Sequence, residues 1–381
     1  MKLIKHGGVT SPRGFKANGL SAGIKRSGKT DLSLIYCDQS VPTVGVFTKN
    51  SIKAAPLLVT QEHLRNHSAQ AIVANSGNAN CFTGDFGLIY ARQTAELAGA
   101  LLGAEASEVL VSSTGIIGKP LPFLKIKKAL PALVKGASVS GGHRAALGIM
   151  TTDLVAKEVA VSIQLSSGDK VTIGACAKGS GMIEPNMATM LGFITTDAAV
   201  SASMLQKLLK RAVEYSFNRI TVDGCMSTND MVTLMANGLA KNTMITRPGK
   251  DYNKFYEALH YVCLDLAKKI VMDGEGATKF LEITVNGAKT EKEAKDIAMK
   301  VANSNLVKTA AYGSNPNWGR VAGAVGTLGL DITEKTLKIK FTSFKKKNIQ
   351  IFIDLNRGRQ SATVYTSDLS IDYVKINGKY S

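Results

Sequence analysis

The sequence predicts a mixed α/β fold in which strands and helices form layers. Segments with the hydrophobic period of a helix are few and long, and strand-like runs lie between them. The chain has 381 residues, of which 45% are hydrophobic, so it can bury a substantial core and has room for about two domains. The predicted helices span about Leu88–Leu102, Ser203–Phe217, Tyr252–Met272 and Ala288–Asn303.

The predicted strands are runs of alternating or continuous apolar residues bounded by turn residues. Val159–Leu165 and Lys170–Ala177 form a predicted hairpin around a Ser-Ser-Gly-Asp turn. Leu281–Val285 alternates and precedes a predicted turn at Asn286-Gly287. No repeat or low-complexity linker marks a domain boundary.

The segment Glu184–Gly192 contains a candidate nucleophile, Thr189, near the midpoint of the chain. By local pattern alone, Thr189 is a buried residue in a core strand over Met187–Ile194. In the alternative, the bond between Ala188 and Thr189 is cut, and Thr189 begins a new chain. Its free α-amine, with an ordinary pKa of about 7.7–8.0, then lies beside its own hydroxyl and can act as the base that this weak nucleophile needs.

Sequence blocks in a fixed order favour the second interpretation. Lys178–Ile183 lies upstream of Thr189, Thr195–Asp197 lies downstream, and further blocks are spread over the chain. With these blocks the chain resembles the ornithine acetyltransferase family, also called the glutamate N-acetyltransferase family, over essentially its full length. The further blocks are Gly19–Lys25, Val46–Asn50, Val73–Asn80, Ser113–Gly118, Ile149–Asp153, Asp273–Lys279, Asn315–Arg320 and Asp372–Asn377.

The resemblance implies a specific version of the α/β fold. An α-β-β-α sandwich of the N-terminal-nucleophile kind is expected over residues 1–279, where it carries the active site. A smaller α/β domain is expected over residues 280–381. At Asn315 the family usually has an aspartate, and we expect only a structural consequence of this difference.

The resemblance also implies a processing step and an activity. By this resemblance, the chain is expected to be cut between Ala188 and Thr189 into an alpha chain (1–188) and a beta chain (189–381), which are expected to associate as a heterotetramer of two alpha and two beta chains. The expected enzyme moves acetyl from N2-acetyl-L-ornithine to L-glutamate through an acetyl-Thr189 intermediate, in arginine biosynthesis. The sequence leaves open whether acetyl-CoA is a second donor.

Acyl transfer develops negative charge on a carbonyl oxygen, and hydrogen-bond donors must stabilise this charge. Thr114-Gly115 follows the strand-like run Glu108–Val111, and local sequence alone favours a plain turn that ends the strand. The resemblance implies instead that Thr114 and Gly115 form the oxyanion-binding pair. The substrate-binding residues that it implies are Thr151, Lys178, Thr189, Glu275, Asn377 and Ser381.

Some of these substrate-binding residues have simpler interpretations from the residues alone. Lys178 lies in a glycine-rich stretch and would be a solvated loop residue, and Glu275 lies between two glycines and would be a turn residue. Ser381 ends a tail that is one residue shorter than is usual in the family. The role of Ser381 is therefore transferred from the family although the match at the end of the chain is not exact.

Gly23–Thr30 matches the phosphate-binding loop pattern G-x-x-x-x-G-K-[ST] at every fixed position. A functional phosphate loop needs a buried strand before it and a helix after it, whose N-terminal amides face the phosphates. Leu32–Tyr36, which follows the match, is typical of a strand. We therefore expect a lysine-rich hairpin loop between two strands, without a bound nucleotide.

The net charge of +18 could indicate binding to nucleic acid. However, the basic residues are spread along the chain. The densest cluster, Lys345–Lys347, lies between the strand-like runs Leu337–Phe341 and Ile349–Ile353, which is typical of a hairpin turn. The sequence therefore predicts no nucleic-acid partner.

Other residue patterns limit the cofactors and the location. The five cysteines are far apart and contain no C-x-x-C pair, which predicts reduced and mostly buried thiols. His63 and His67 have i,i+4 spacing but no evident third ligand, so we expect a surface helix end there, no metal and no cofactor. No apolar run resembles a signal peptide or a membrane span, which predicts a cytoplasmic protein without a membrane partner.

Two other functions remain as alternatives. The first is an N-terminal-nucleophile aminopeptidase or amidase, in which water takes the acyl group. The second is a nucleotide- or nucleic-acid-binding protein, which depends on the Gly23–Thr30 pattern and on the net charge.

Overall fold

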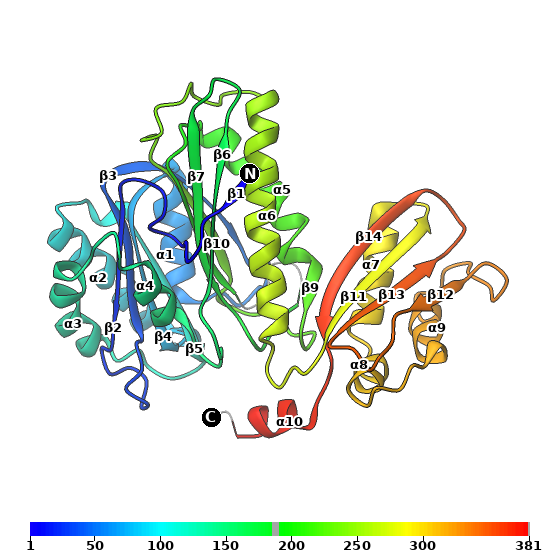
Figure 1. Ribbon diagram of the computed structural model, residues 1–381. Coiled ribbons are helices and arrows are strands. Elements are labelled where there is room, and N and C mark those ends of the chain that lie inside the picture. The colour runs from blue at the N-terminus through cyan, green and yellow to red at the C-terminus, as the bar shows by residue number, and fades with distance from the viewer. Residues whose placement is uncertain (185–189, 380–381) are drawn as a thin grey trace. The chain divides into compact units, whose positions relative to one another are not determined.

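The computed structural model describes residues 1–184 and 190–379 (Figure 1). The chain divides into two compact units. Unit 1 comprises Met1–Gly179, Thr189–Ser216 and Ser227–Leu266, and unit 2 comprises Ser180–Ala188, Phe217–Met226 and Ala267–Ser381. Each unit contains its own sheet. The domain change that the sequence predicts after residue 279 stays a prediction.

Unit 1 contains a nine-stranded sheet, and one of its strands, the long β3 (Leu32–Phe47), connects the two parts of that sheet. The first part of β3 pairs with β2 (Phe15–Leu20) and β4 (Ser68–Asn78), and its last part pairs with β10 (Met231–Ala236). The register with β4 shifts between Tyr36 and Val41, so β3 passes from one layer of strands to the other. The remaining strands are β1 (Lys2–Leu3), β5 (Val109–Ile116), β6 (Lys157–Gln164), β7 (Lys170–Lys178) and β8 (Leu191–Thr196).

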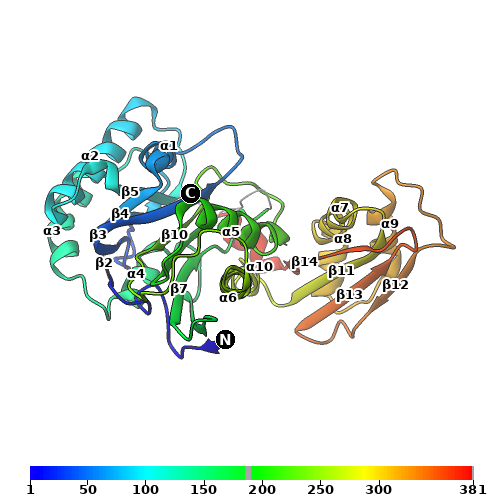
Figure 2. The same cartoon turned by 90° about the horizontal axis from the view of Figure 1, so that it is seen from above.

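The core of unit 1 lies between these two layers of strands. Buried side chains of β2, β3 and β4 pack there against those of β7, β8 and β10, among them Phe15, Phe193 and Met231. Helices lie outside each of the two layers (Figure 2), and one further helix, Gly142–Ile149, packs Ala145, Ala146 and Ile149 into the core between them. The order helix, sheet, sheet, helix confirms the predicted fold class. Its helices are α1 (Ala55–His63), α2 (Gly84–Leu102) and α3 (Phe123–Lys135) on one side, α5 (Ala202–Glu214) and α6 (Lys250–Met272) on the other, and α4 (Gly142–Ile149).

Unit 2 contains a five-stranded sheet in the order β12-β13-β11-β14-β9. Helices α7, α8 and α9 pack their buried alanines and valines against it and form a separate core. The bounds are β9 (Ile220–Thr221), β11 (Phe280–Ala288), β12 (Lys338–Phe341), β13 (Asn348–Asp354), β14 (Gln360–Ser367), α7 (Glu291–Ala302), α8 (Asn305–Tyr312), α9 (Trp318–Gly326) and α10 (Ile371–Asn377). Short 3-10 helices span Leu64–Asn66 and Ala106–Glu108 in unit 1, and Phe217–Arg219 in unit 2.

Most predicted elements are confirmed. Helices α2, α5 and α6 lie where the hydrophobic period placed them, although α5 ends at Glu214, before the predicted Phe217. The hairpin of β6 and β7 is confirmed by their antiparallel pairing. Lys345–Lys347 lies between the antiparallel strands β12 and β13, as predicted. Of the predicted strand over Met187–Ile194, the structure places the start of β8 at Leu191, and residues 187–189 lie outside the described part.

One prediction around residue 287 is wrong, and a neighbouring helix begins later than predicted. Asn286-Gly287 does not end the strand, because β11 continues to Ala288 with a register shift against β14 after Val285. Gly287 takes a φ of 70° there, which glycine adopts without strain. The helix predicted over about Ala288–Asn303 is confirmed as α7. It begins at Glu291, where the Thr290 side chain accepts a hydrogen bond from the Glu293 amide and caps it.

Candidate active site

The predicted oxyanion pair lies inside β5 rather than in a turn that ends it. Thr114 is buried, and its Oγ1 accepts a hydrogen bond of 3.2 Å from Nζ of Lys178. Gly115 has a φ of 133°, and a Cβ on it would lie 2.5 Å from the carbonyl carbon of Gly77 in the neighbouring strand β4. Only glycine fits this approach of two backbones. The hydroxyl of Thr114 thus contacts the ammonium group of Lys178 and lies next in the chain to the backbone amide of Gly115.

Lys178 is the last residue of β7 and is buried, so it is not the solvated loop residue that the local sequence suggests. It belongs to a network around the buried carboxylate of Asp153. Oδ1 of Asp153 accepts hydrogen bonds from Nζ of Lys157 at 2.6 Å and from the amide of Gly179 at 2.8 Å, and Oδ2 accepts one from the amide of Thr151 at 2.9 Å. Asp153 therefore fixes the backbone beside two predicted site residues, Thr151 and Lys178.

The electrostatics of this network favour bound anions. Burial alone would raise the pKa of Asp153, but the charges of Lys178 and Lys157 and the hydrogen bonds hold it well below its ordinary value. Asp153 is thus a carboxylate between two ammonium groups, which leaves a net positive charge in a buried place. Such an excess of positive charge suits a substrate carboxylate or a developing oxyanion.

Lys25 is a neighbour of this network that sequence reasoning missed. Nζ of Lys25 donates to the carbonyl of Thr30 at 2.7 Å. Burial lowers the pKa of Lys25 to about 8; Lys178 acts in the same direction, while the charges of Asp31 and Asp153 oppose it. Its sequence signal was hidden, because Lys25 lies inside the pattern that resembles a phosphate loop.

The Gly23–Thr30 segment itself is a hairpin loop, as predicted. It connects the antiparallel strands β2 and β3, and β3 begins at Leu32, where a phosphate loop would require a helix. The loop is held by the carboxylate of Asp31, which accepts hydrogen bonds from the amides of Ala22, Ile24 and Lys25 at 2.6 to 2.9 Å. A nucleotide-binding role therefore loses its structural basis.

The predicted nucleophile Thr189 and its neighbour Ala188 lie outside the described residues. The structure does describe Met190, the residue that follows Thr189. The amide of Met190 donates to Oδ1 of Asp230 at 2.9 Å, and its carbonyl accepts from the amide of Met231 at 3.2 Å. Sequence reasoning missed Asp230, although it ends a polar run, Ser-Thr-Asn-Asp, directly before the apolar strand β10.

Asn229 connects this segment to the oxyanion pair. Its Nδ2 donates to the carbonyl of Ser113 at 2.8 Å and to the carbonyl of Ala79 at 2.7 Å. Ser113 directly precedes Thr114 in β5. The start of β10 and the end of β5 are thereby fixed to each other within unit 1.

Glu275 and Asn377 lie together in unit 2. Nδ2 of Asn377, the last residue of α10, donates to Oε2 of Glu275 at 2.8 Å, and the amide of Glu275 donates to the carbonyl of Ser180 at 3.0 Å. In the same unit, Asp223 accepts a hydrogen bond from the hydroxyl of Tyr373, and burial raises the pKa of Asp223. Ser381 lies outside the described residues. The functional roles of all these residues stay predictions.

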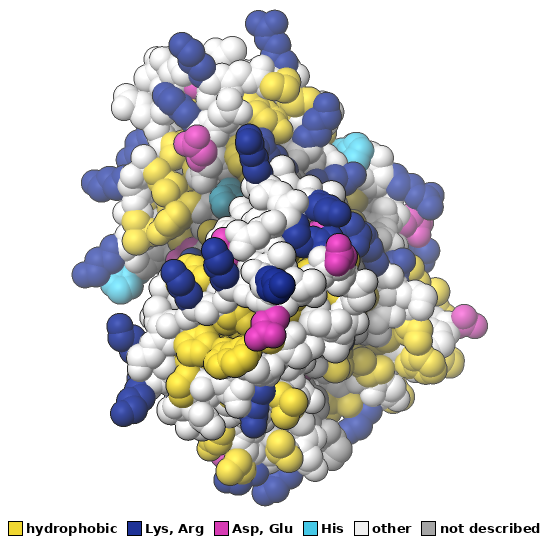
Figure 3. All heavy atoms as spheres, turned by 90° about the vertical axis from the view of Figure 1, so that its right-hand side faces the viewer, with side chains coloured by type: hydrophobic (Ala, Val, Ile, Leu, Met, Phe, Trp, Pro, Cys, Tyr) yellow, Lys and Arg dark blue, Asp and Glu magenta, His cyan; other side chains and the backbone are white. Residues whose placement is uncertain are grey.

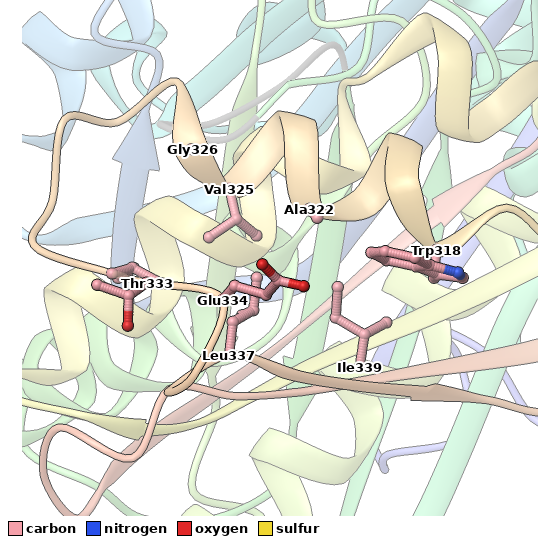
Figure 4. Close-up of a pocket in the computed structure, with 9 residues that line it drawn as sticks. Trp318, Ala322, Val325, Gly326, Thr333, Glu334, Leu337 and Ile339 are labelled. Carbon is pink, nitrogen blue, oxygen red and sulfur yellow. The ribbon is translucent and has the colours of Figure 1, made fainter.

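An apolar pocket elsewhere in unit 2 contains none of the predicted site residues. It has a volume of about 310 Å³ and lies between α9 and the segment that leads into β12 (Figure 4). Trp318, Val325 and Ile339 are among its apolar lining, and Glu334 is its charged residue. The pocket is therefore separate from the candidate active site.

Three further observations concern metals, membranes and charge. Within residues 1–184 and 190–379, no group of three or more His, Cys, Asp or Glu side chains could hold a metal ion. No helix in this described part of the chain is long and apolar enough to cross a membrane. The Lys and Arg side chains are scattered over the face of the molecule in Figure 3.

Comparison with known proteins identifies the family. Residues 16–381 match the model of the ArgJ family. The arginine biosynthesis bifunctional protein ArgJ of Caldanaerobacter subterraneus is 44% identical, over 99% of this chain and 99% of that protein. The protein of the same name from Geobacter sulfurreducens is 44% identical, over 97% and 99%. A solved ornithine acetyltransferase from Mycobacterium tuberculosis is 40% identical over 48% of this chain and 97% of that chain, with a TM-score of 0.45. The family resemblance seen in the sequence is confirmed, and the chain belongs to the ArgJ family.

Proposed function

We propose that the chain is a self-cleaving acetyltransferase that moves acetyl from N2-acetyl-L-ornithine to L-glutamate. The observation that carries the proposal is the buried contact between Lys178 and Thr114, at the end of a strand where Gly115 exposes its backbone to close approach. Membership of the ArgJ family supports it, because the relatives named above are arginine biosynthesis proteins. The proposal includes the cut between Ala188 and Thr189.

Processing uses the hydroxyl of Thr189. Its oxygen adds to the carbonyl carbon of Ala188, a C–O bond forms, the C–N bond breaks, and the hydroxyl proton ends on the nitrogen. Water then hydrolyses the ester, which returns the hydroxyl and leaves a free amine on Thr189. The donors of Thr114 and Gly115 stabilise the oxyanion that develops in both steps.

Acetyl transfer repeats this chemistry with the substrate in place of the peptide bond. The free amine of Thr189 takes the hydroxyl proton, and the oxygen attacks the acetyl carbonyl of N2-acetylornithine. Ornithine leaves with the proton on its α-nitrogen, and the acetyl group stays on Thr189. Glutamate then attacks this ester through its neutral α-amine, and the hydroxyl is regenerated.

N2-acetylornithine and glutamate can bind to the same pocket in turn, since each carries an α-carboxylate next to the reacting nitrogen. The positive charge of Lys178 suits this carboxylate, and the backbone of Thr151 is fixed beside it by Asp153. Glu275 and Asn377 offer a carboxylate and an amide for amine and carboxyl groups of the substrates. Ser381 completes the proposed set. Acetyl-CoA is tested as a second donor by supplying it in place of N2-acetylornithine.

The two chains would remain associated after the cut. Strands β8 and β10 belong to residues 189–381, and they lie between β7 and β3 of residues 1–188 in one continuous sheet. All five cysteines are free, so no disulfide joins the chains. The assembly of two alpha and two beta chains and the cytoplasmic location are part of this proposal.

The test supplies purified protein with N2-acetylornithine, with and without glutamate. The proposal predicts sustained release of ornithine only when glutamate is present, together with formation of N-acetylglutamate. Equal ornithine release without glutamate, with acetate as the product, would instead establish the N-terminal-nucleophile amidase.

A further inference from the structure

The apolar pocket of unit 2 contains none of the residues that the proposed reaction uses (Figure 4). Its volume of about 310 Å³ lies at the lower end of the range for small-molecule sites. Val325 of α9 belongs to the buried core of unit 2, and Leu337 and Ile339 pack against the same core. The pocket is therefore a hollow over a packed core, and its wall is mainly apolar.

Glu334 is the charged residue in this apolar lining. In Figure 4 its carboxylate points into the space between α9 and the side chains of Leu337 and Ile339. Within the part of the chain that the structure describes, this carboxylate forms no hydrogen bond or ion pair. Arg320, the basic residue of α9, donates instead to the carbonyl of Leu306 at 2.7 Å. Because Glu334 is exposed, a ligand can reach its negative charge.

Trp318 gives the pocket a second group that attracts cations. It is the first residue of α9, and 63% of its surface is exposed although it lines the pocket. The face of an indole ring is apolar and electron-rich, so it attracts ammonium groups. A cation that reaches both the Trp318 ring and the Glu334 carboxylate gains two attractions at once.

The segment that carries Glu334 is fixed by backbone hydrogen bonds. The amide of Leu337 donates to the carbonyl of Thr333 at 3.0 Å, which closes a turn around Glu334. Nδ2 of Asn356 donates to the carbonyl of Thr336 at 2.8 Å and holds this turn against the sheet of unit 2. A ligand therefore meets a preformed wall, and little ordering of the protein opposes its binding.

From these contacts we infer that the pocket binds a small organic cation, whose ammonium group meets Glu334 and Trp318 and whose apolar stem contacts the apolar wall. The carboxylate repels anions, and a neutral apolar ligand would take water from Glu334 without replacing it. The inference goes beyond the proposed function and does not rest on it, because this binding requires neither the cut nor acetyl transfer.

The test titrates the purified protein with n-pentylammonium at constant ionic strength and follows the fluorescence of Trp318. The chain has no other tryptophan, so the signal reports on this pocket. The expected result is a saturable change with a dissociation constant of about 1–10 mM, an affinity within reach of so small a probe. The uncharged analogue n-pentanol should bind about tenfold more weakly, and the anion n-pentanoate should not bind at these concentrations.

Three variants locate the binding. Glu334→Gln keeps the size of the side chain and removes its charge, so its affinity for n-pentylammonium should fall about tenfold, to that for n-pentanol. Asp296→Asn is the matched control, because it removes a negative charge that pairs with Lys292 on the surface of the same unit, and it should bind as wild type does. Ala322→Leu should fill the pocket from α9 and abolish the binding of both probes.

Saturation-transfer NMR of the probes provides a second measurement that does not depend on tryptophan emission. No binding of n-pentylammonium by either method, an equal affinity for n-pentanol, or an unchanged affinity in Glu334→Gln would overturn the inference. An oligomer that Glu334→Gln dissociates would show that a basic side chain of a second copy occupies the pocket instead. The inference and the proposed function can fail separately, since an uncut and inactive wild type that binds n-pentylammonium would still support this site.

Discussion

At the scale of single residues, the candidate site is organised by buried charges rather than by exposed ones. Lys157 and Asp153 form an ion pair with both side chains completely buried, and the charge of Lys178 acts on the same carboxylate. Buried pairs of this kind contribute little net stability, because desolvation offsets their attraction, but removing one partner leaves an unpaired charge. The pair therefore fixes positions: Thr151 and Gly179 are held by the same two oxygens.

Thr114→Ala tests the oxyanion role. Acetyl loading from N2-acetylornithine should slow by about 10²–10³-fold, as for removal of one donor, while the KM changes much less. Rapid-quench measurement of acetylated protein gives this rate. Thr43→Ala is the control, because Thr43 is equally buried and its hydroxyl donates only to the carbonyl of Val41. Equal losses in both variants would reduce the role of Thr114 to packing.

Asp153→Asn should reveal the buried network through stability and pH. The pKa of Asp153 is lowered in the folded protein, so its carboxylate stabilises the fold fully when the pH is above the unfolded-state pKa of about 3.9. This stabilisation is lost as the pH falls from there through the lowered pKa of the folded state. At neutral pH the variant should lose about 3–5 kcal/mol of unfolding free energy, because the Lys157 charge stays buried without its partner.

Urea titrations at several pH values measure this difference. The gap between wild type and variant should narrow as the pH falls below about 4. Asp38→Asn is the control, since Asp38 pairs with Lys16 on the surface at 2.9 Å and such pairs contribute little. A gap that does not change with pH would contradict the lowered pKa of Asp153 in the folded protein.

At the scale of elements, the sequence predicted the helices and strands that have a clear hydrophobic period. It did not predict where β11 ends, because the conformation of one glycine determines that. The long helices and the β6–β7 hairpin followed from their patterns, and the sequence also excluded a phosphate loop because Leu32–Tyr36 is typical of a strand. The continuation of β11 through Gly287 could not be predicted, because Asn-Gly is also the usual signal of a hairpin turn. Lys25 and Asp230 were missed because only tertiary packing brings them to the site.

Gly287→Ala should destabilise unit 2. Its φ is 70°, and a Cβ would lie 2.6 Å from a carboxylate oxygen of Asp354 and 2.9 Å from the amide of Asn356. The expected loss is about 1–2 kcal/mol, from the left-handed backbone alone. Gly323→Ala in α9 meets no atom within 4 Å and should stabilise by about 0.5–1 kcal/mol. Thermal unfolding of both variants measures the contrast, and similar changes in the two would contradict it.

The Gly23–Thr30 loop gives a second contrast between neighbours. Neither wild type nor Lys29→Ala should bind ATP. Because Lys29 is exposed, the rate of acetyl transfer by the variant should stay within a few fold of the wild-type rate. Lys25 is half-buried beside the charges of Asp153 and Lys178, so Lys25→Ala should weaken transfer by roughly tenfold, equivalent to about 1.4 kcal/mol. Calorimetry with ATP and steady-state kinetics separate the cases. Measurable ATP binding that is lost in Lys29→Ala would revive the nucleotide-binding alternative.

At the scale of the whole molecule, the proposed cut divides a sheet that stays continuous through hydrogen bonds. β8 pairs with β7, β10 pairs with β3, and β8 and β10 pair with each other. Two of these ladders would join residues 1–188 to residues 189–381, so the cut would not remove the interactions that hold the fold. The family was predictable from ordered sequence blocks, whereas the hydrogen bonds of Asn229 to Ser113 and of Asp230 to the Met190 amide depend on the folded sheet.

Processing should therefore produce two chains that separate only when the protein is denatured. On reducing denaturing gels, wild type should give two bands, each about half of 40.4 kDa, and on native gels one species. Thr189→Ala should remain one chain, because alanine has no oxygen to receive the acyl group. Thr189→Ser is the control that keeps a hydroxyl and should still be cut.

Incubation with N2-acetylornithine alone should add one acetyl mass to the 189–381 chain, and glutamate should remove it. A fully active wild type that stays uncut would contradict self-processing, and a cut enzyme that never carries acetyl would leave Thr189 a role in processing only.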